Sequence, residues 1–247
     1  YRRQRQMCIR DRYQTTVSTH GVIRIHDHEQ SQHLVHLWQD RFLKLHPKVR
    51  YLEYTVPTWF SGLGAGTADI AITGRRAYRA DLKALEQIWG YPPLELFIAT
   101  GGYNLHTGNT PGVIVFVNKD NPLTGVTLDQ LDGIFGAQRT GGFVGTKWTT
   151  AVARGPEKNL RTWGQLGLTG DWTGLPIQLY GIDATLSGWS AVMQLEAFRG
   201  GTKWNPAIRE FVRGGWEVPA DVQLVSGVAG DRAGIGFSFM RVVEKNP

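Results

Sequence analysis

Hydroxyl side chains stand at three expected helix starts, each after an expected strand and a short loop: Ser31, Thr58, and Ser187 with Gly188. The free N–H groups at a helix start and the positive end of the helix dipole favour an anion there. Since Ser and Thr are also the usual N-cap residues, capping alone explains any single start. The recurrence of the pattern in both halves of the chain is what favours anion binding.

Charged side chains that follow two of the expected strands are suited to binding an oxyanion. Asp27 follows the first expected strand, where a carboxylate can accept a proton from a protonated oxyanion and reject an anion that has no proton to give. Arg75 and Arg76 come just after the third expected strand, where a guanidinium can form paired hydrogen bonds to an oxyanion. The alternative for an exposed Arg pair is ordinary solvation.

The sequence favours neither a metal nor catalysis. Five of the seven histidines fall within seventeen residues: His20, His26, His28, His33 and His36. Their spacing matches no standard zinc motif, so no metal is predicted. The glycine run from Gly62 to Gly66 precedes a strand instead of opening a helix, which argues against a dinucleotide loop, and no cofactor is predicted. No known nucleophile motif is present, so the chain is not predicted to be an enzyme; a hydrolase that pairs Ser187 with a histidine is the remaining catalytic alternative.

The first part of the chain alternates between strand and helix patterns. Expected strands at 22–25, 49–56 and 69–73 are separated by expected helices at 31–45 and 58–63. This β-α-β-α-β order is typical of a parallel sheet. In the first helix, five apolar side chains follow helical spacing: Leu34, Leu37, Trp38, Phe42 and Leu45.

The second part repeats the alternation after a polar helix at 80–89, a fourth strand at 94–100 and a glycine-containing loop at 101–112. Its expected elements are strand 113–117, helices 127–135 and 159–166, strand 177–180, helices 187–198 and 222–229, and strand 234–239. Thr127 is the expected N-cap of its helix, and Gly136 ends that helix. We therefore predict an α/β fold with lobe 1 at 13–105, lobe 2 at 106–233, and a strand within 234–247 that returns toward lobe 1.

Composition sets limits on the function. The chain has 247 residues, 41% of them hydrophobic, which suits one large domain or two small lobes. Residues 1–12 hold five Arg, one Asp and the only cysteine, Cys8, and they predict a non-native or disordered tail. Without them the formal charge falls from +6 to +2, which does not indicate nucleic-acid binding. No apolar run approaches the roughly 18 residues that cross a bilayer.

Five segments together resemble the phosphate-binding, periplasmic-binding-protein-like component of phosphate ABC transporters, in a divergent bacterial branch. The two most specific are TADIAITGRR (67–76) and VFVNKDNPLTGVTLDQLDGIFG (115–136); the others are residues 23–47, 159–172 and 176–189. The resemblance implies a two-lobed periplasmic-binding-protein-like fold that closes over a small oxyanion, most directly phosphate. It also implies a membrane permease as partner, a monomer, and a periplasmic or other extracytoplasmic location. No secretory signal is visible in the chain.

The resemblance also implies which residues bind the ligand. The loop after the first strand contributes Asp27 and His28, the loop after the second contributes Thr55 and Thr58, and Arg75 follows the third. From the second lobe, Ser187 and Gly188 complete the predicted set.

Two departures from the family pattern leave an alternative open. Asp27 and Glu29 stand where relatives usually have a glycine-serine or glycine-threonine loop, and Asp183 lies where relatives usually have an Arg followed by Ser-Gly-Thr. The alternative is therefore a binding-protein fold that serves as a sensor or scaffold with an altered pocket. Relatives also continue past the strand at 234–239, so the chain is expected to be a fragment.

Overall fold

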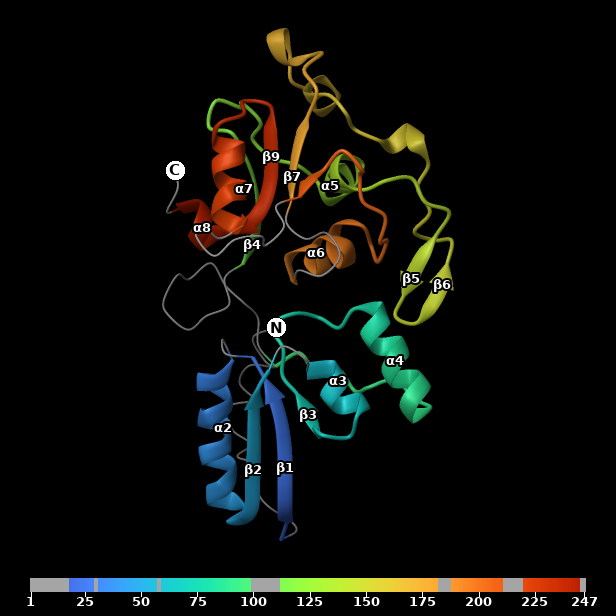
Figure 1. Ribbon diagram of the computed structural model, residues 1–247. Helices are drawn as coiled ribbons and strands as arrows, with labels where there is room; N and C mark the ends of the chain where they lie inside the picture. The colour runs from blue at the N-terminus through green and yellow to red at the C-terminus, as the bar shows by residue number, and fades with distance from the viewer. Residues whose placement is uncertain are drawn as a thin grey trace, which may run out of the picture. The chain divides into compact units, whose positions relative to one another are not determined.

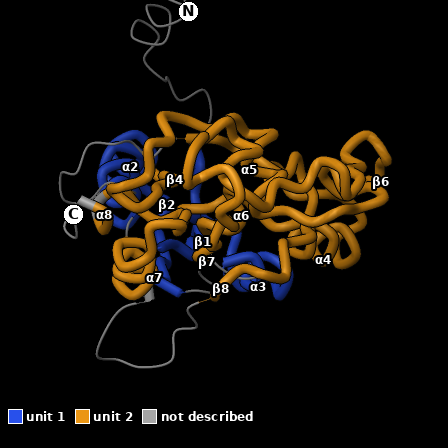
Figure 2. Tube along the Cα trace, turned by 90° about the horizontal axis from the view of Figure 1, so that it is seen from above, with its two compact units in different colours: residues 1–73 blue, residues 74–247 orange. Residues whose placement is uncertain are grey.

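Figure 1 shows the computed structural model of the chain, which describes residues 18–28, 31–56, 59–98, 112–181, 188–210 and 220–244. The chain divides into two compact units, residues 1–73 and 74–247 (Figure 2). The predicted tail at 1–12, Thr58 and Ser187 lie outside the described residues. The lobe limits proposed from the sequence stay a prediction.

Unit 1 contains a parallel three-stranded sheet. Its strands are β1 (His20–Asp27), β2 (Lys48–Thr55) and β3 (Ile70–Ala71), in the order β2-β1-β3. The register runs from His20 opposite Lys48 to Asp27 opposite Thr55, so both long strands end at the same edge. Helix α2 (Gln32–Leu45) packs against β2, and helix α3 (Trp59–Gly64) packs against β1 and β3 (Figure 1). The parallel sheet predicted from the element order is confirmed.

Unit 2 contains a mixed four-stranded sheet of β4 (Val113–Val117), β9 (Gly234–Phe239), β7 (Gln178–Gly181) and β8 (Arg209–Glu210), in that order. The β4–β9 pair is antiparallel, and the β9–β7 and β7–β8 pairs are parallel. The predicted α/β class, with a mostly parallel sheet in each of two units, is confirmed.

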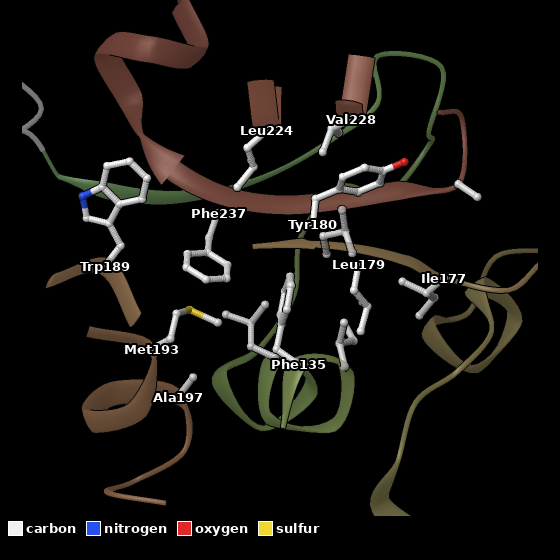
Figure 3. Close-up of a cluster of buried hydrophobic side chains, with 14 of the residues drawn as sticks. Phe135, Ile177, Leu179, Tyr180, Trp189, Met193, Ala197, Leu224, Val228 and Phe237 are labelled. Carbon is white, nitrogen blue, oxygen red and sulfur yellow. The ribbon is translucent and has the colours of Figure 1, made fainter. Parts of the chain in front are cut away.

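The predicted strand at 234–239 is β9, a central strand of the unit 2 sheet. The sequence analysis expected this strand to return toward lobe 1. The first five of its six residues are buried. Leu224 and Val228 of helix α7 (Ala220–Ala229) lie on one side of it, and Phe135 and Met193 lie on the other (Figure 3). Apolar cover on both sides explains why the strand is apolar at every position except Ser238 and its glycines.

Several shorter elements complete unit 2. They are α4 (Arg79–Trp89), α5 (Leu128–Phe135), the β5 (Gly142–Val144) and β6 (Lys147–Thr149) hairpin, the 3-10 turns η1 (Pro156–Lys158), η2 (Trp163–Leu166) and η3 (Gly170–Trp172), α6 (Gly188–Val192) with the π-helical turn η4 (Met193–Ala197), and α8 (Met240–Glu244). The helix predicted at 159–166 is only the turn η2. No described helix has both the length and the apolar character needed to cross a membrane.

The strand predicted at 94–100 is not formed in its described part. Residues 92–98 have no helix or strand, and the side chains of Leu94 and Leu96 are 84% and 70% exposed. A strand needs a partner for its backbone groups, and none of the described strands pairs with this segment. The apolar run alone therefore gave the wrong prediction.

Helix α5 begins with the cap that the sequence predicts. The Thr127 hydroxyl accepts a hydrogen bond from the Gln130 N–H at 3.1 Å, and the Gln130 side chain accepts one from the Thr127 N–H at 2.8 Å. We expect Thr127→Ala to lower the free energy of unfolding of unit 2 by about 1 kcal/mol, since it leaves an N–H of the first turn without its partner. Urea unfolding tests this, with Thr124→Ala in the preceding loop as control; equal losses in both variants would contradict it.

Candidate functional site

The carboxyl edge of the unit 1 sheet brings together three of the predicted ligand-binding residues. Asp27 ends β1 directly opposite Thr55 at the end of β2, and His28 follows Asp27. The indole N–H of Trp59, at the start of α3, donates to the Asp27 carbonyl at 2.9 Å, and the Trp59 and His28 ring centres are 5.3 Å apart. In open α/β sheets this edge is where ligands collect.

Asp27 is the unusual residue of this edge. Its side chain is fully buried, yet neither carboxylate oxygen has a hydrogen-bond partner among the described residues. Burial, the largest cause, raises the pKa of Asp27; the nearby Thr55 hydroxyl lowers the pKa, and the Glu53 carboxylate raises it further. Thr55 and Glu53 therefore lie close enough to act on Asp27 without meeting hydrogen-bond geometry. A ligand that donates a hydrogen bond to this carboxylate would supply the partner it lacks, but the buried oxygens become accessible only if the sheet edge opens.

Polar side chains of α2 bind β2, the strand that lies beside Asp27. Gln32 donates to the Thr55 hydroxyl at 3.3 Å, while His36 lies 2.9 Å from one oxygen of Glu53 and Gln39 donates to the other. Positions 32, 36 and 39 share one face of the helix, and the buried Val35 lies beside them. Phe42, whose ring centre is 6.2 Å from that of Tyr51 on β2, also lies beside them, so the face that meets β2 is mixed.

The apolar stripe that the sequence analysis identified on this helix is partly exposed. Leu37, Trp38 and Leu45 are exposed, whereas Val35, which was not in the stripe, is buried. The spacing of the glutamines and His36 was the signal that sequence reasoning missed.

Ser31 does not cap its helix. Its backbone is already helical and its hydroxyl donates to the His28 carbonyl at 2.8 Å. The hydroxyl thus closes the turn after β1 instead of pointing its oxygen at a free N–H, which corrects the capping prediction for this residue.

Gly62, the first glycine of the run and a buried residue of α3, has a packing role. A Cβ placed on Gly62 would overlap the ring of His26, whose other neighbour is the edge of the Tyr54 ring at 5.7 Å between centres. Gly62 therefore lets α3 approach β1 closely.

In unit 2, Arg75 lies beside the start of α6. A Cβ placed on Gly188 would be 3.5 Å from the Cβ of Arg75, so these two predicted residues are neighbours. The Arg75 guanidinium donates to Asp81 and to the Arg76 carbonyl, both at 2.9 Å, and it lies 4.1 Å from the centre of the Tyr78 ring. Asp81 thus already holds the guanidinium that sequence analysis assigned to an oxyanion.

The histidine cluster does not form a metal site where the structure describes it. Within the described ranges, no three His, Cys, Asp or Glu side chains are grouped so that they could hold a metal ion. His36 binds Glu53, and the His46 ring stacks on Phe42 at 4.3 Å between centres.

Both units have an α/β fold, and the carboxyl edge of the unit 1 sheet holds a buried carboxylate. No protein-family model matches the chain. Over 210 residues it is 30% identical to the phosphate-binding protein PstS of Pseudomonas aeruginosa, in two strains. The alignment covers 83% of this chain and 54% of PstS, so the chain spans about half the length of the curated relatives it matches. The resemblance predicted from the sequence is confirmed.

Solved structures were also compared. A possible phosphate binding protein from Planctomyces limnophilus aligns with a TM-score of 0.47 at 18% identity, covering 93% of this chain and 68% of that one. PstS from Borrelia burgdorferi aligns with a TM-score of 0.48 at 12% identity, covering 91% and 72%. Because both TM-scores are below 0.5, the similarity to the curated PstS sequences carries the functional proposal.

Proposed function

We propose that this chain is part of the substrate-binding component of a phosphate ABC transporter, working outside the cytoplasmic membrane with a membrane permease. The observation that carries the proposal is the buried carboxylate of Asp27, without a hydrogen-bond partner at the ligand edge of a parallel sheet, in a chain 30% identical to PstS. Its task is capture and release, so the proposal contains no chemical step.

Asp27 would select the protonation state of the ligand. Phosphate near neutral pH carries at least one proton and can donate it in a hydrogen bond to Asp27, while sulfate has none to donate. A site built around such an acceptor rejects the anion that leaves it unpaired. Thr55, Thr58 and Ser187 would donate hydroxyl hydrogen bonds to the remaining oxygens, and His28 would line the same edge.

In this proposal the two predicted lobes close over the ligand. Arg75, which lies beside Gly188, would exchange part of its pairing with Asp81 for a ligand oxygen. Binding energy then favours the closed form, as expected for a protein that must present its cargo to a permease.

A sensor or scaffold with an altered pocket is the second candidate. Two observations favour it: Glu53 places a second carboxylate near Asp27, and Asp81 occupies the Arg75 guanidinium. Both reduce the net attraction for a dianion. This candidate predicts a folded protein that no small oxyanion stabilises.

Thermal unfolding with anions separates the two candidates. A ligand that binds only the native state at one hundred times its Kd stabilises it by about 2.7 kcal/mol, which raises the melting temperature. We expect phosphate and arsenate to raise the Tm of the full chain at constant ionic strength and pH, and sulfate to leave it unchanged. No rise with any anion, for a protein shown to be folded by circular dichroism, would establish the second candidate. An equal rise with sulfate would refute selection by Asp27.

A further inference from the structure

A pocket lies within unit 2. It has a volume of about 540 Å³ and is formed by the segments at 137–138 and 203–206 together with Arg161. The two segments are joined by a β-bridge between Gly136 and Trp204 and by a 3.0 Å hydrogen bond from the Ala137 N–H to the Lys203 carbonyl. Its walls are therefore fixed by the backbone, and it includes none of the predicted phosphate-binding residues.

The lining of this pocket carries only positive charge. Arg161 and Lys203 are among its lining residues, and no acidic residue lines it. Arg161 is held in place by hydrogen bonds at 3.0 Å from its guanidinium to the carbonyls of Gly133 and Leu160. Burial, the largest cause, and the positive charge of Arg154 both lower the pKa of Arg161, which shows that two guanidiniums repel each other here.

The buried positive charge near Arg161 is incompletely balanced by carboxylates. Arg154 is only 6% exposed, and two of its guanidinium nitrogens, Nε and Nη2, have no hydrogen-bond partner among the described residues. Its Nε lies 3.3 Å from an oxygen of Asp132, but that carboxylate already accepts two hydrogen bonds from Arg139, at 2.8 and 2.7 Å. Glu157 supplies a further attraction for Arg154. An anion near Arg161 would relieve the excess positive charge.

One wall of the pocket is aromatic. The Trp204 ring stacks on Phe237 at 5.8 Å between centres and meets the Phe198 ring edge-on at 4.7 Å, so its position is fixed by the core. Pro206 extends this apolar wall. A purely inorganic anion would bind Arg161 and Lys203 and leave the apolar wall in contact with water.

We propose that this pocket binds a small organic carboxylate, with its anionic group at Arg161 and Lys203 and its flat apolar body against Trp204. An ion pair at a partly exposed site contributes little alone, and apolar contact with a fixed indole adds to it. This inference does not depend on the proposed phosphate site.

Titration with three probes tests the proposal by NMR of the full chain, followed at the indole N–H signal of Trp204. Benzoate is expected to shift this signal in a saturable way. Benzamide has the same shape without the charge and is expected to bind at least fivefold more weakly. Inorganic phosphate is expected to produce no saturable shift. Equal binding of benzamide would overturn the role of charge, and equal binding of phosphate would overturn the role of the apolar body.

Variants locate the binding. Lys203→Gln is expected to weaken benzoate binding about fivefold, since an exposed ion pair contributes up to about 1 kcal/mol. The matched control Lys119→Gln replaces an exposed lysine that does not line the pocket and is expected to leave the affinity unchanged. If benzoate gives no saturable shift, or if both variants bind it equally, the pocket is not a carboxylate site.

Discussion

Asp27→Asn is expected to stabilise unit 1 near neutral pH and to remove part of the pH dependence of its stability. Burial raises the pKa of Asp27 in the folded protein above its value in the unfolded chain. The stability contributed by this group is therefore fully present below the unfolded pKa and is lost as the pH rises through the folded pKa. Asparagine has nearly the same shape and no charge, so it avoids the cost of an unpartnered buried charge, about 1–3 kcal/mol or more.

Hydrogen exchange measured on peptides from β1 and β2 from about pH 3.5, just below the ordinary Asp pKa, up to pH 8, corrected for the intrinsic rate, would report this change within unit 1. The gap in opening free energy between the variant and the wild type should widen as the pH increases. Asp40→Asn, which removes an exposed carboxylate from α2, serves as control and should follow the wild type. Parallel pH profiles for Asp27→Asn and the wild type would show that Asp27 is not held with a raised pKa.

Asp132→Asn is expected to have the largest effect on unit 2, a loss of about 3–5 kcal/mol in the free energy of unfolding. The Asp132 carboxylate is buried and pairs with both Arg139 and Arg154. Removing its charge takes away the carboxylate that pairs with both buried guanidiniums, although Glu157 still attracts Arg154. Arg139 also donates to the carbonyls of Val152 and Phe198, so its displacement would loosen the contact between α5 and η4.

The same helix provides a matched control for this prediction. Asp129 of α5 pairs with Arg199, but both side chains are exposed. Asp129→Asn should therefore cost less than about 1 kcal/mol, including its interaction with the helix dipole. Urea unfolding of both variants, measured side by side, makes the comparison. Similar losses for Asp129→Asn and Asp132→Asn would mean that burial does not govern the strength of these ion pairs.

Patterns confined to a few neighbouring residues were sufficient for much of the fold. The β-α-β-α-β order predicted the parallel sheet of unit 1, and Thr127 marked the start of α5. The apolar spacing within each strand or helix and the N-cap of a helix both involve residues within about four positions of each other. Short stretches of sequence therefore show them. Asp27 was also found from the residues alone, because it follows the first expected strand, whereas Thr55 was assigned through the family resemblance.

Tertiary contacts decided the rest. The segment at 94–98 has the composition of a strand, but strand formation depends on a partner from elsewhere in the chain. The apolar spacing of α2 predicted one buried face, but Val35 is the only buried residue of this helix, and its contacts with β2 also include hydrogen bonds from Gln32, His36 and Gln39 to Thr55 and Glu53.

The sequence by itself determined the α/β class, the parallel order of unit 1 and the position of Asp27 at a strand end, because these depend on local patterns. Only the tertiary structure showed that the Asp27 carboxylate is buried without a hydrogen-bond partner and that one Asp132 serves two arginines. Burial and charge balance arise when distant segments exclude water together, and no short stretch of sequence records which segments will meet.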